Sequence, residues 1–159
     1  MSDIQLEVVG VRVEMPANQP ILLLKAAHAP RFLPIWIGTA EAQAVSIVLR
    51  GLEPPRPLSH NLMLEIFRAY DDAPERVVIT AQEQHVFHAA IHTSMGKVLD
   101  ARPSDAVPLA LLAQCPVYTT GDLLDSAGID APQPDEEEVA QFRDFLDHVS
   151  PEDFENGDG

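Results

Sequence analysis

The sequence of 159 residues has very little cysteine and no long apolar run. Its one cysteine, Cys115, cannot form an internal disulfide, which fits a reducing compartment and favours a buried structural thiol over a nucleophile. No apolar stretch approaches the roughly 18 residues that a membrane-spanning helix needs. The first residues also lack the basic lead of a secretory signal. We therefore expect a cytoplasmic protein that does not enter a membrane.

Basic residues are scarce and do not cluster. The formal net charge is −15 at pH 7. Residues 1–120 contain 12 acidic residues and 9 Lys or Arg, whereas residues 121–159 contain 13 acidic residues and Arg143 alone. A protein that binds nucleic acid usually presents a basic stripe, and an acidic field repels a polyanion. The charge thus disfavours nucleic acid as a partner, and the acidic C-terminal segment favours a basic protein partner.

The signatures of several common catalytic and metal sites are missing. The chain has no glycine-rich phosphate loop, no Gly-x-Ser-x-Gly elbow and no pair of cysteines at ligand spacing. Six histidines are present, but no His-x-His pair. His88 and His92 share a face of a predicted strand about 13 Å apart, at ~3.3 Å per residue. A zinc site built from histidines is therefore not expected.

The signals that are present mix strands and helices within one α+β domain. Alternating apolar residues predict strands over 6–15, 20–27, 31–38, 76–82, 85–93, 97–101 and 116–120, with a hairpin turn at Glu83-Gln84. Helical periodicity and end signals predict helices over 39–52, 60–70, 102–114 and 121–128. For residues 1–130 we expect a compact mixed β-sheet or barrel-like core with packed helices. Residues 131–159 are expected to form an acidic linker and an amphipathic C-terminal helix with a frayed end.

A proline-rich connection separates two of the predicted helices. Residues 53–58, Glu-Pro-Pro-Arg-Pro-Leu, can form neither a helix nor a central strand, because their prolines fix φ and lack N–H donors. Thr39 is predicted to cap the helix before this connection, and Ser59 the helix that follows it. Ser104 is predicted to cap a later helix, with Pro108 in its first turn. The connection is therefore expected to be rigid.

Polar and charged residues gather at three predicted helix starts, where free backbone N–H groups collect. They are Glu41 in the first helix, Ser59, His60 and Asn61 in the second, and Ser104 and Asp105 in the third, with Arg56 and Arg102 just before two of these starts. Arginines beside helix starts make a receptor for phosphate or carboxylate. Alternatively, an arginine pairs with Glu41. This residue falls on the predicted inner stripe of its helix, with Val45, Val48, Leu49 and Leu52, and it requires a cation or donors if it is buried. From the residues alone the structural pairing is favoured.

Two long stretches of the chain resemble the bifunctional nuclease family. The first is LPIWIGTAEAQAVSIVLRGLEPPRPLSHNL at residues 33–62, and the second is DARPSDAVPLAL at residues 100–111, followed by PVY. The resemblance covers about residues 4–130, and its blocks match at Glu41, Gly51, 55–57, His60 and 102–105. The acidic C-terminal segment resembles the tail of actinobacterial members.

The resemblance implies an α+β domain that associates as a homodimer or a higher homo-oligomer and has DNase and RNase activity. One departure bears on catalysis. The family usually has Thr-His-Asp where this chain has Ser59, His60 and Asn61. Serine in place of threonine keeps a side chain able to cap a helix. Asparagine in place of aspartate removes a carboxylate that could bind a metal or orient His60, which leaves activity open.

Two functions of different classes follow from these residues. In the first, the protein hydrolyses phosphodiesters, with His60 as general base or acid and with Arg56 and Arg102 stabilising the phosphate. Ser59, Ser104 and Asn61 then complete the anion site, and Glu41 and Asp105 hold a divalent cation, Mg²⁺ or Mn²⁺, that polarises the phosphate. In the second, the same pocket binds a small anionic ligand without catalysis. A third reading makes the charged residues a network that only stiffens the core.

Overall fold

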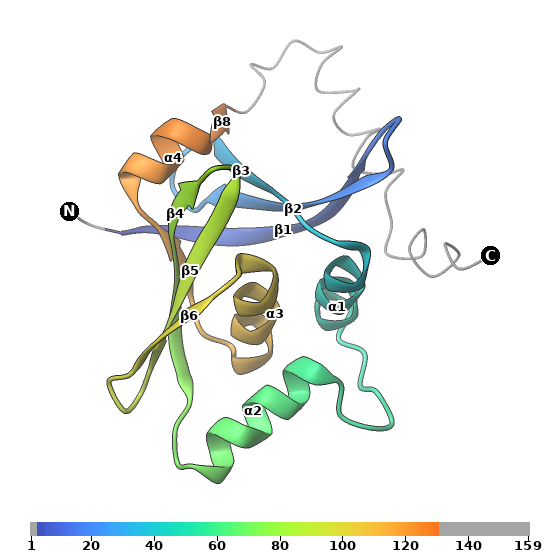
Figure 1. Ribbon diagram of the computed structural model, residues 1–159, viewed down its shortest axis with the longest axis vertical. Helices are drawn as coiled ribbons and strands as arrows, with labels where there is room; N and C mark the ends of the chain where they lie inside the picture. Colours follow the sequence, from blue (N-terminus) through green and yellow to red (C-terminus); the bar gives the residue numbers. More distant parts are fainter. Residues whose placement is uncertain (1–2, 131–159) are drawn as a thin grey trace.

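The structure, a computed structural model, describes residues 3–130. Within this range four helices pack against one eight-stranded sheet (Figure 1), which confirms the α+β expectation. None of these helices has the length and apolar character needed to cross a bilayer. The acidic linker and C-terminal helix expected over 131–159 lie outside the described residues.

The sheet consists of two antiparallel halves joined by one short strand. Its order is β6-β5-β4-β7-β1-β2-β3-β8, and every pair of neighbours is antiparallel except β4 and β7, which are parallel. The strands are β1 (Ile4–Glu14), β2 (Gln19–Ala26), β3 (Arg31–Trp36), β4 (Pro74–Glu83), β5 (Val86–Thr93), β6 (Val98–Ala101), β7 (Val117–Thr119) and β8 (Ile129–Asp130). β7 therefore connects the half formed by β1–β3 to the half formed by β4–β6.

The β4–β5 hairpin has a two-residue turn. Glu83 pairs with Val86, and the two residues between them, Gln84 and His85, have φ values of 51° and 67°. Two successive left-handed residues match the right-handed twist of the flanking strands, although such turns usually contain glycine or asparagine. The tip lies one residue beyond the expected Glu83-Gln84, and it projects His85 from the end of the hairpin.

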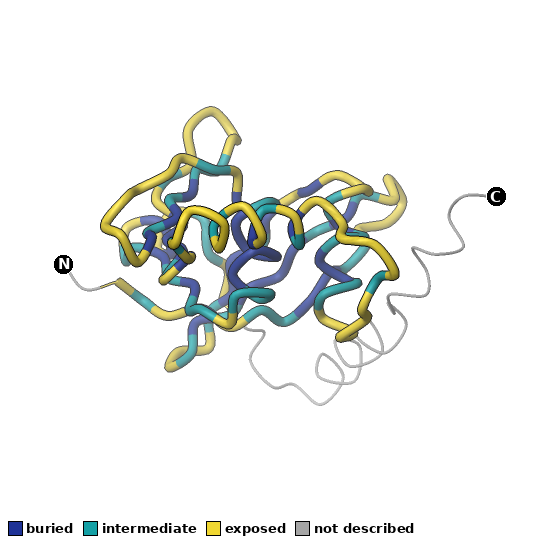
Figure 2. Tube along the Cα trace, turned by 90° about the horizontal axis from the view of Figure 1, so that it is seen from below, coloured by how far each residue is buried: buried dark blue, intermediate teal, exposed yellow. Residues whose placement is uncertain are grey.

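The helices are α1 (Thr39–Leu49), α2 (Ser59–Ala69), α3 (Pro103–Ala113) and α4 (Gly121–Ala127). α3 is the central helix, because it packs against α1, α2, β4 and β5. Its residues Ala106, Val107, Leu109 and Ala110 are at most 1% exposed. Figure 2 shows the buried part of the chain running through the middle of the molecule, with exposed segments around it. α2 thus packs on the core through α3, whereas α1 also packs against β1 and β2, and α4 packs against β3 and β4.

Three predicted helix caps are wrong by one or two residues. The residues at the N-cap positions of α1, α2 and α3 are Gly38, Leu58 and Arg102. None of these three residues accepts a capping hydrogen bond with a side-chain oxygen. Thr39, Ser59 and Ser104 are therefore within the helices rather than before them. The reason at α3 is Pro103, whose fixed φ suits the first helical position and starts the helix early.

Two further expectations about the helices are wrong. Pro108 lies inside α3 rather than in its first turn, because α3 begins earlier than the capping pattern predicted. Leu49 and Leu52, expected on the inner stripe of the first helix, are 41% and 46% exposed. α1 instead buries Ala42, Val45 and Ser46. Small residues allow α1 to approach α3 closely.

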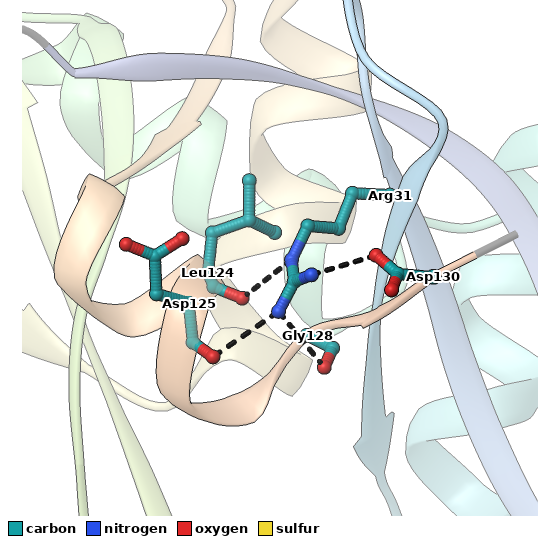
Figure 3. A network of polar contacts seen from close by, with 5 residues as sticks. All are labelled: Arg31, Leu124, Asp125, Gly128 and Asp130. Carbon is teal, nitrogen blue, oxygen red and sulfur yellow. Dashed lines mark hydrogen bonds and ion pairs between the residues drawn. The ribbon is translucent and has the colours of Figure 1, made fainter.

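Arg31 fastens β3 to the end of α4 (Figure 3). Its Nε and Nη2 donate to the carbonyl oxygens of Leu124 and Asp125, at 3.0 and 3.1 Å. Nη1 pairs with Asp130 at 2.7 Å, and Nη2 also donates to the carbonyl of Gly128 at 3.4 Å. The last carbonyl groups of a helix lack intrahelical donors. The Arg31 guanidinium supplies donors to them and thereby links α4 to the edge of the sheet.

Candidate functional site

The starts of α1, α2 and α3 converge on one cavity. Glu41 comes from α1, His60 from α2 and Asp105 from α3, and all three line a space of about 610 Å³. We call this space the His60 cavity. Its wall also contains Ser59 and Met63. Three segments that are far apart in the sequence therefore meet where the helix-start pattern placed them, although their chemical roles remain predictions.

Arg102 joins the two carboxylates of this cavity. Its Nε donates to Asp105 Oδ2 at 2.9 Å, and its Nη2 lies 2.8 Å from the same oxygen. Nη2 also lies 3.4 Å from Glu41 Oε1. The hydrogen bond that Arg102 donates to Asp105 is the main cause that raises the pKa of Arg102, and Glu41 adds to it. Arg102, and not Arg56, is therefore the arginine that neutralises Glu41.

His60 lies against the other oxygen of Asp105. The distance from His60 Nε2 to Asp105 Oδ1 is 3.8 Å, which is too long for a hydrogen bond but short enough for a strong charge interaction. His60 is 8% exposed, and its Nε2 is buried and has no hydrogen-bond partner among the described residues. Burial lowers the pKa of His60, and the negative charge of Asp105 only partly opposes this effect. The imidazole is therefore neutral at pH 7.

Gly38 makes room for the Glu41 carboxylate. A Cβ atom on Gly38 would collide with Oε2 of Glu41, so the carboxylate lies directly over the residue that precedes α1. The backbone of Gly38 has φ −81° and ψ 166°, which any residue adopts. Close approach, and not backbone strain, is thus the reason for glycine at this position.

The remaining predicted site residues are placed differently. Arg56 is exposed and is not part of the cavity wall. Asn61 accepts a hydrogen bond from the Leu58 N–H at 3.2 Å, so its side-chain oxygen serves the start of α2. Ser104 is 7% exposed and faces a neighbouring hollow. Of the expected anion-binding residues, only Arg102 lies beside the paired carboxylates, and Ser59 contributes an exposed wall position.

The donor set is a poor fit for a resident Mg²⁺ or Mn²⁺. Both candidate ligands, Glu41 and Asp105, are within ion-pair distance of the Arg102 guanidinium, which already balances their charge. Across residues 3–130, no group of three or more His, Cys, Asp or Glu side chains is close enough to hold a metal ion. The described residues thus form an arginine–carboxylate centre at the position where the sequence suggested a divalent metal ion.

The single thiol lies away from this centre. Cys115 follows α3 and is half-buried, and burial raises the pKa of its thiol. A protonated thiol is a weak nucleophile at neutral pH. The expectation of a structural rather than a reactive cysteine is consistent with this environment.

A second hollow adjoins Arg102, and sequence reasoning missed it. Its volume is about 640 Å³, and its wall comes from both halves of the sheet and from the start of α3. We call it the Trp36 groove, and its principal side chains are Gln19, Trp36, Gln82, His85, Phe87 and Arg102. The only available signal was Trp36, the sole tryptophan, at the end of a predicted strand.

Comparison with known proteins agrees with the resemblance noted above. The family model described as Bifunctional nuclease domain matches residues 22–132. Two proteins of Mycobacterium tuberculosis, Uncharacterized protein MT1877 of strain CDC 1551 / Oshkosh and Uncharacterized protein Rv1829 of strain H37Rv, are each 40% identical to this chain over 159 residues. Each match covers 94% of this chain and 97% of the relative. The chain belongs to the bifunctional nuclease domain family.

Proposed function

We propose that this protein hydrolyses phosphodiester bonds in single-stranded DNA or RNA at the His60 cavity. The observation that carries the proposal is the arrangement of Asp105, with one oxygen beside the neutral His60 and the other on Arg102. This arrangement supports a role for His60 as proton acceptor, for Asp105 as the carboxylate that stabilises the charged imidazole and for Arg102 as the cation that binds phosphate. Family membership supports the reaction class.

His60 is the group that moves the proton in this reaction. A neutral imidazole accepts a proton from water as the water oxygen forms its bond to phosphorus. The bond from phosphorus to the departing sugar oxygen then breaks, and that oxygen receives the proton from the imidazolium. Asp105, 3.8 Å from Nε2, stabilises the imidazolium between the two transfers. The low pKa of His60 keeps it in the accepting form at neutral pH.

Arg102 is the group that binds the phosphate. Its guanidinium has five N–H donors, and the contacts to Asp105 and Glu41 use those of Nε and Nη2. The side chain is 61% exposed, so the donors of Nη1 remain accessible to a phosphate oxygen. The two carboxylates fix the plane of the guanidinium before the substrate arrives, which is the preorganisation that stabilises a charged transition state.

The electrostatics restrict the substrate. Glu41 and Asp105 together carry one more negative charge than Arg102 balances, and the whole chain has a net charge of −15. Long duplexes are repelled by such a field, and their binding depends on many cationic contacts that the cavity lacks. Short or single-stranded substrates, which present one phosphate to Arg102, are therefore favoured.

A second candidate function is a binding module for a small phosphorylated or carboxylated ligand. It is favoured by the burial of His60, whose side chain is only 10% exposed and whose Nε2 is sealed from solvent. A base that reacts with bound water needs access to that water. In this function Arg102 binds the anion, and His60 contributes only to packing.

One experiment separates the two functions. The purified protein is incubated with fluorescently labelled single-stranded DNA and RNA, beside the His60→Gln variant prepared in the same way. Removal of a general base lowers the rate by about 100-fold or more. Equal cleavage by both proteins means that a contaminant or another site is responsible. A set of phosphorylated metabolites is tested in parallel by thermal shift, and stabilisation without any cleavage decides for the binding module.

A further inference from the structure

We infer that the Trp36 groove binds a nucleobase whose attached phosphate lies at Arg102. The inference rests on the proposed function, because it names the part of the nucleotide that the hydrolytic site itself does not hold. The lining residues of the groove come mainly from the end of β3, the tip of the β4–β5 hairpin and the start of α3, which are elements labelled in Figure 1. Its volume of about 640 Å³ lies within the range of pockets that bind small ligands.

Arg102 connects the groove to the His60 cavity. The residue is part of the groove wall, and its guanidinium contacts the two carboxylates that line the cavity. A nucleotide bound with its phosphate at Arg102 therefore has its sugar and base within reach of the groove. The wall of the groove contains no Asp or Glu, and Arg102 is its one formal charge among the described residues. Arg102 is thus the group of the groove wall that can pair with a phosphate, and it shares its donors with Glu41 and Asp105.

Trp36 supplies a surface for stacking. It is 53% exposed, which is unusual for so large an apolar ring. Its Nε1 donates a 3.0 Å hydrogen bond to Glu14 Oε2 on β1, so the ring orientation is set before any ligand binds. Phe87 adds a second aromatic side chain to the wall. Stacking of bases on exposed, oriented aromatic rings is the principal means by which proteins hold single-stranded nucleic acid.

The rim of the groove supplies hydrogen-bonding groups for a base edge. Gln82 and His85 are exposed at the tip of the β4–β5 hairpin and line the groove. Gln19 lines it from β2, where its Nε2 donates to the Ile37 carbonyl at 2.9 Å and leaves its side-chain oxygen as an acceptor. Amide and imidazole groups both donate and accept, which matches the alternating edge of a nucleobase. A plain aliphatic ligand would leave these groups without partners.

The chain contains its own reporter for this site, because Trp36 is the only tryptophan. The experiment is a titration of the full-length protein with adenosine 5′-monophosphate, followed by tryptophan fluorescence. We expect saturable quenching, since a stacked base contacts the indole directly. Ribose 5-phosphate has the same phosphate without the base, and it should leave the fluorescence unchanged. The absence of quenching by adenosine 5′-monophosphate, or equal quenching by both compounds, would overturn the inference.

Variants test the same point by calorimetry. Trp36→Leu should weaken the binding of adenosine 5′-monophosphate about 10- to 100-fold, the effect expected for loss of a stacking ring. Trp36→Phe retains an aromatic ring and should restore part of the affinity, which also guards against a folding defect in the leucine variant. Tyr70→Ala is the matched control, because Tyr70 is an exposed aromatic residue, 81% exposed, outside both hollows. Equal affinities of wild type and Trp36→Leu contradict the inference.

A nucleic acid strand and a free nucleotide share this chemistry, and two further arms distinguish the sources. Replacing single nucleotides of a short oligonucleotide by abasic units should raise its Kd at one position only, if a strand is the ligand. Tight binding of the mononucleotide with no gain from added nucleotides assigns the groove to a free nucleotide. Tyr70→Ala, outside both hollows, should show the same quenching as wild type. Quenching without cleavage by any preparation therefore refutes the hydrolytic function alone, and cleavage that is indifferent to Trp36→Leu and to abasic units refutes the base site alone.

Discussion

Asp105 Oδ1 lies 3.8 Å from His60 Nε2, while the opposite oxygen of the same carboxylate accepts from Arg102. The carboxylate is thus shared between a cation that is always charged and an imidazole that burial keeps neutral. A protonated His60 would lie beside the Asp105 carboxylate, whose other oxygen already accepts a hydrogen bond from Arg102. This relationship links the titration of His60 to both the stability and the chemistry of the site.

The stability of the protein should decrease below about pH 6.5 because of His60. Its pKa in the folded state is lowered from the usual 6.5 by burial. Above that pH neither state holds the proton, so the contribution to stability is complete. As the pH falls, the unfolded state takes up a proton that the folded state resists, and the free energy of unfolding decreases until the folded pKa is reached. Thermal melts of wild type and His60→Gln between pH 8 and 5 measure this. Parallel curves for the two proteins would show that His60 is not perturbed.

Arg102 and Arg56 should differ in their effect on catalysis. Arg102→Met removes the cation between the carboxylates and the phosphate, and kcat/KM should decrease by about 100-fold, as for the loss of one strong donor to a transition state. Arg56→Met makes the same chemical change at an exposed position outside the cavity wall, and should alter the rate by no more than about twofold. The measurement is the cleavage of a single-stranded oligonucleotide. A large effect of Arg56→Met would restore the role that its position before α2 suggested.

Gly38→Ala should disturb the site more than the fold. The backbone angles of Gly38 suit alanine, and the colliding atom is the far end of the Glu41 side chain, which can move away. We expect a small change in Tm and displacement of Glu41 from Arg102. Combining Gly38→Ala with Glu41→Ala, which removes the colliding carboxylate, gives a double-mutant cycle in which a coupling on the order of 0.5 kcal/mol or more is expected. Strict additivity would mean that the glycine acts on something other than Glu41.

Gly128→Ala should destabilise the fold. A Cβ atom there would collide with the Leu124 carbonyl, which is backbone and cannot turn aside, and would press on Arg31 Nε. Such overpacking costs about 1–3 kcal/mol. Gly121→Ala is the matched control at the start of the same helix, because its Cβ would have no contact closer than 4.0 Å. Chemical denaturation compares the two variants. Equal stabilities would mean that the Arg31 network of Figure 3 adapts to the added methyl group.

The helices and most of the strands could be predicted from the sequence, because they depend on local pattern. The meeting of three helix starts at one cavity depends on tertiary packing, and the expectation of a shared pocket was favoured only by the family resemblance. Capping residues were less informative, because the sequence does not distinguish a serine at the N-cap position from a serine inside the first turn of the helix. At α3 the conformational preference of Pro103 prevailed over the capping preference of Ser104.

The part of the site that escaped prediction depends on tertiary structure. Arg56 and Arg102 both precede a helix start, and only the packing of α1 against α3 decides that Arg102 is the one near Glu41. The Trp36 groove is harder still, because its walls come from strands on opposite halves of the sheet. No pattern in the sequence predicts that Trp36 and His85 line the same hollow.

The two halves of the sheet are joined through the short strand β7. Its three residues pair with β4 on one side and with β1 on the other, and Thr119 Oγ1 donates to the Ile79 carbonyl at 3.0 Å in the interior of the sheet. The walls of the groove come from the two halves of the sheet, and β7 is the strand that connects these halves. We therefore expect substitutions in β7, which is not part of the groove wall, to alter the spacing of the walls and with it the affinity for a ligand.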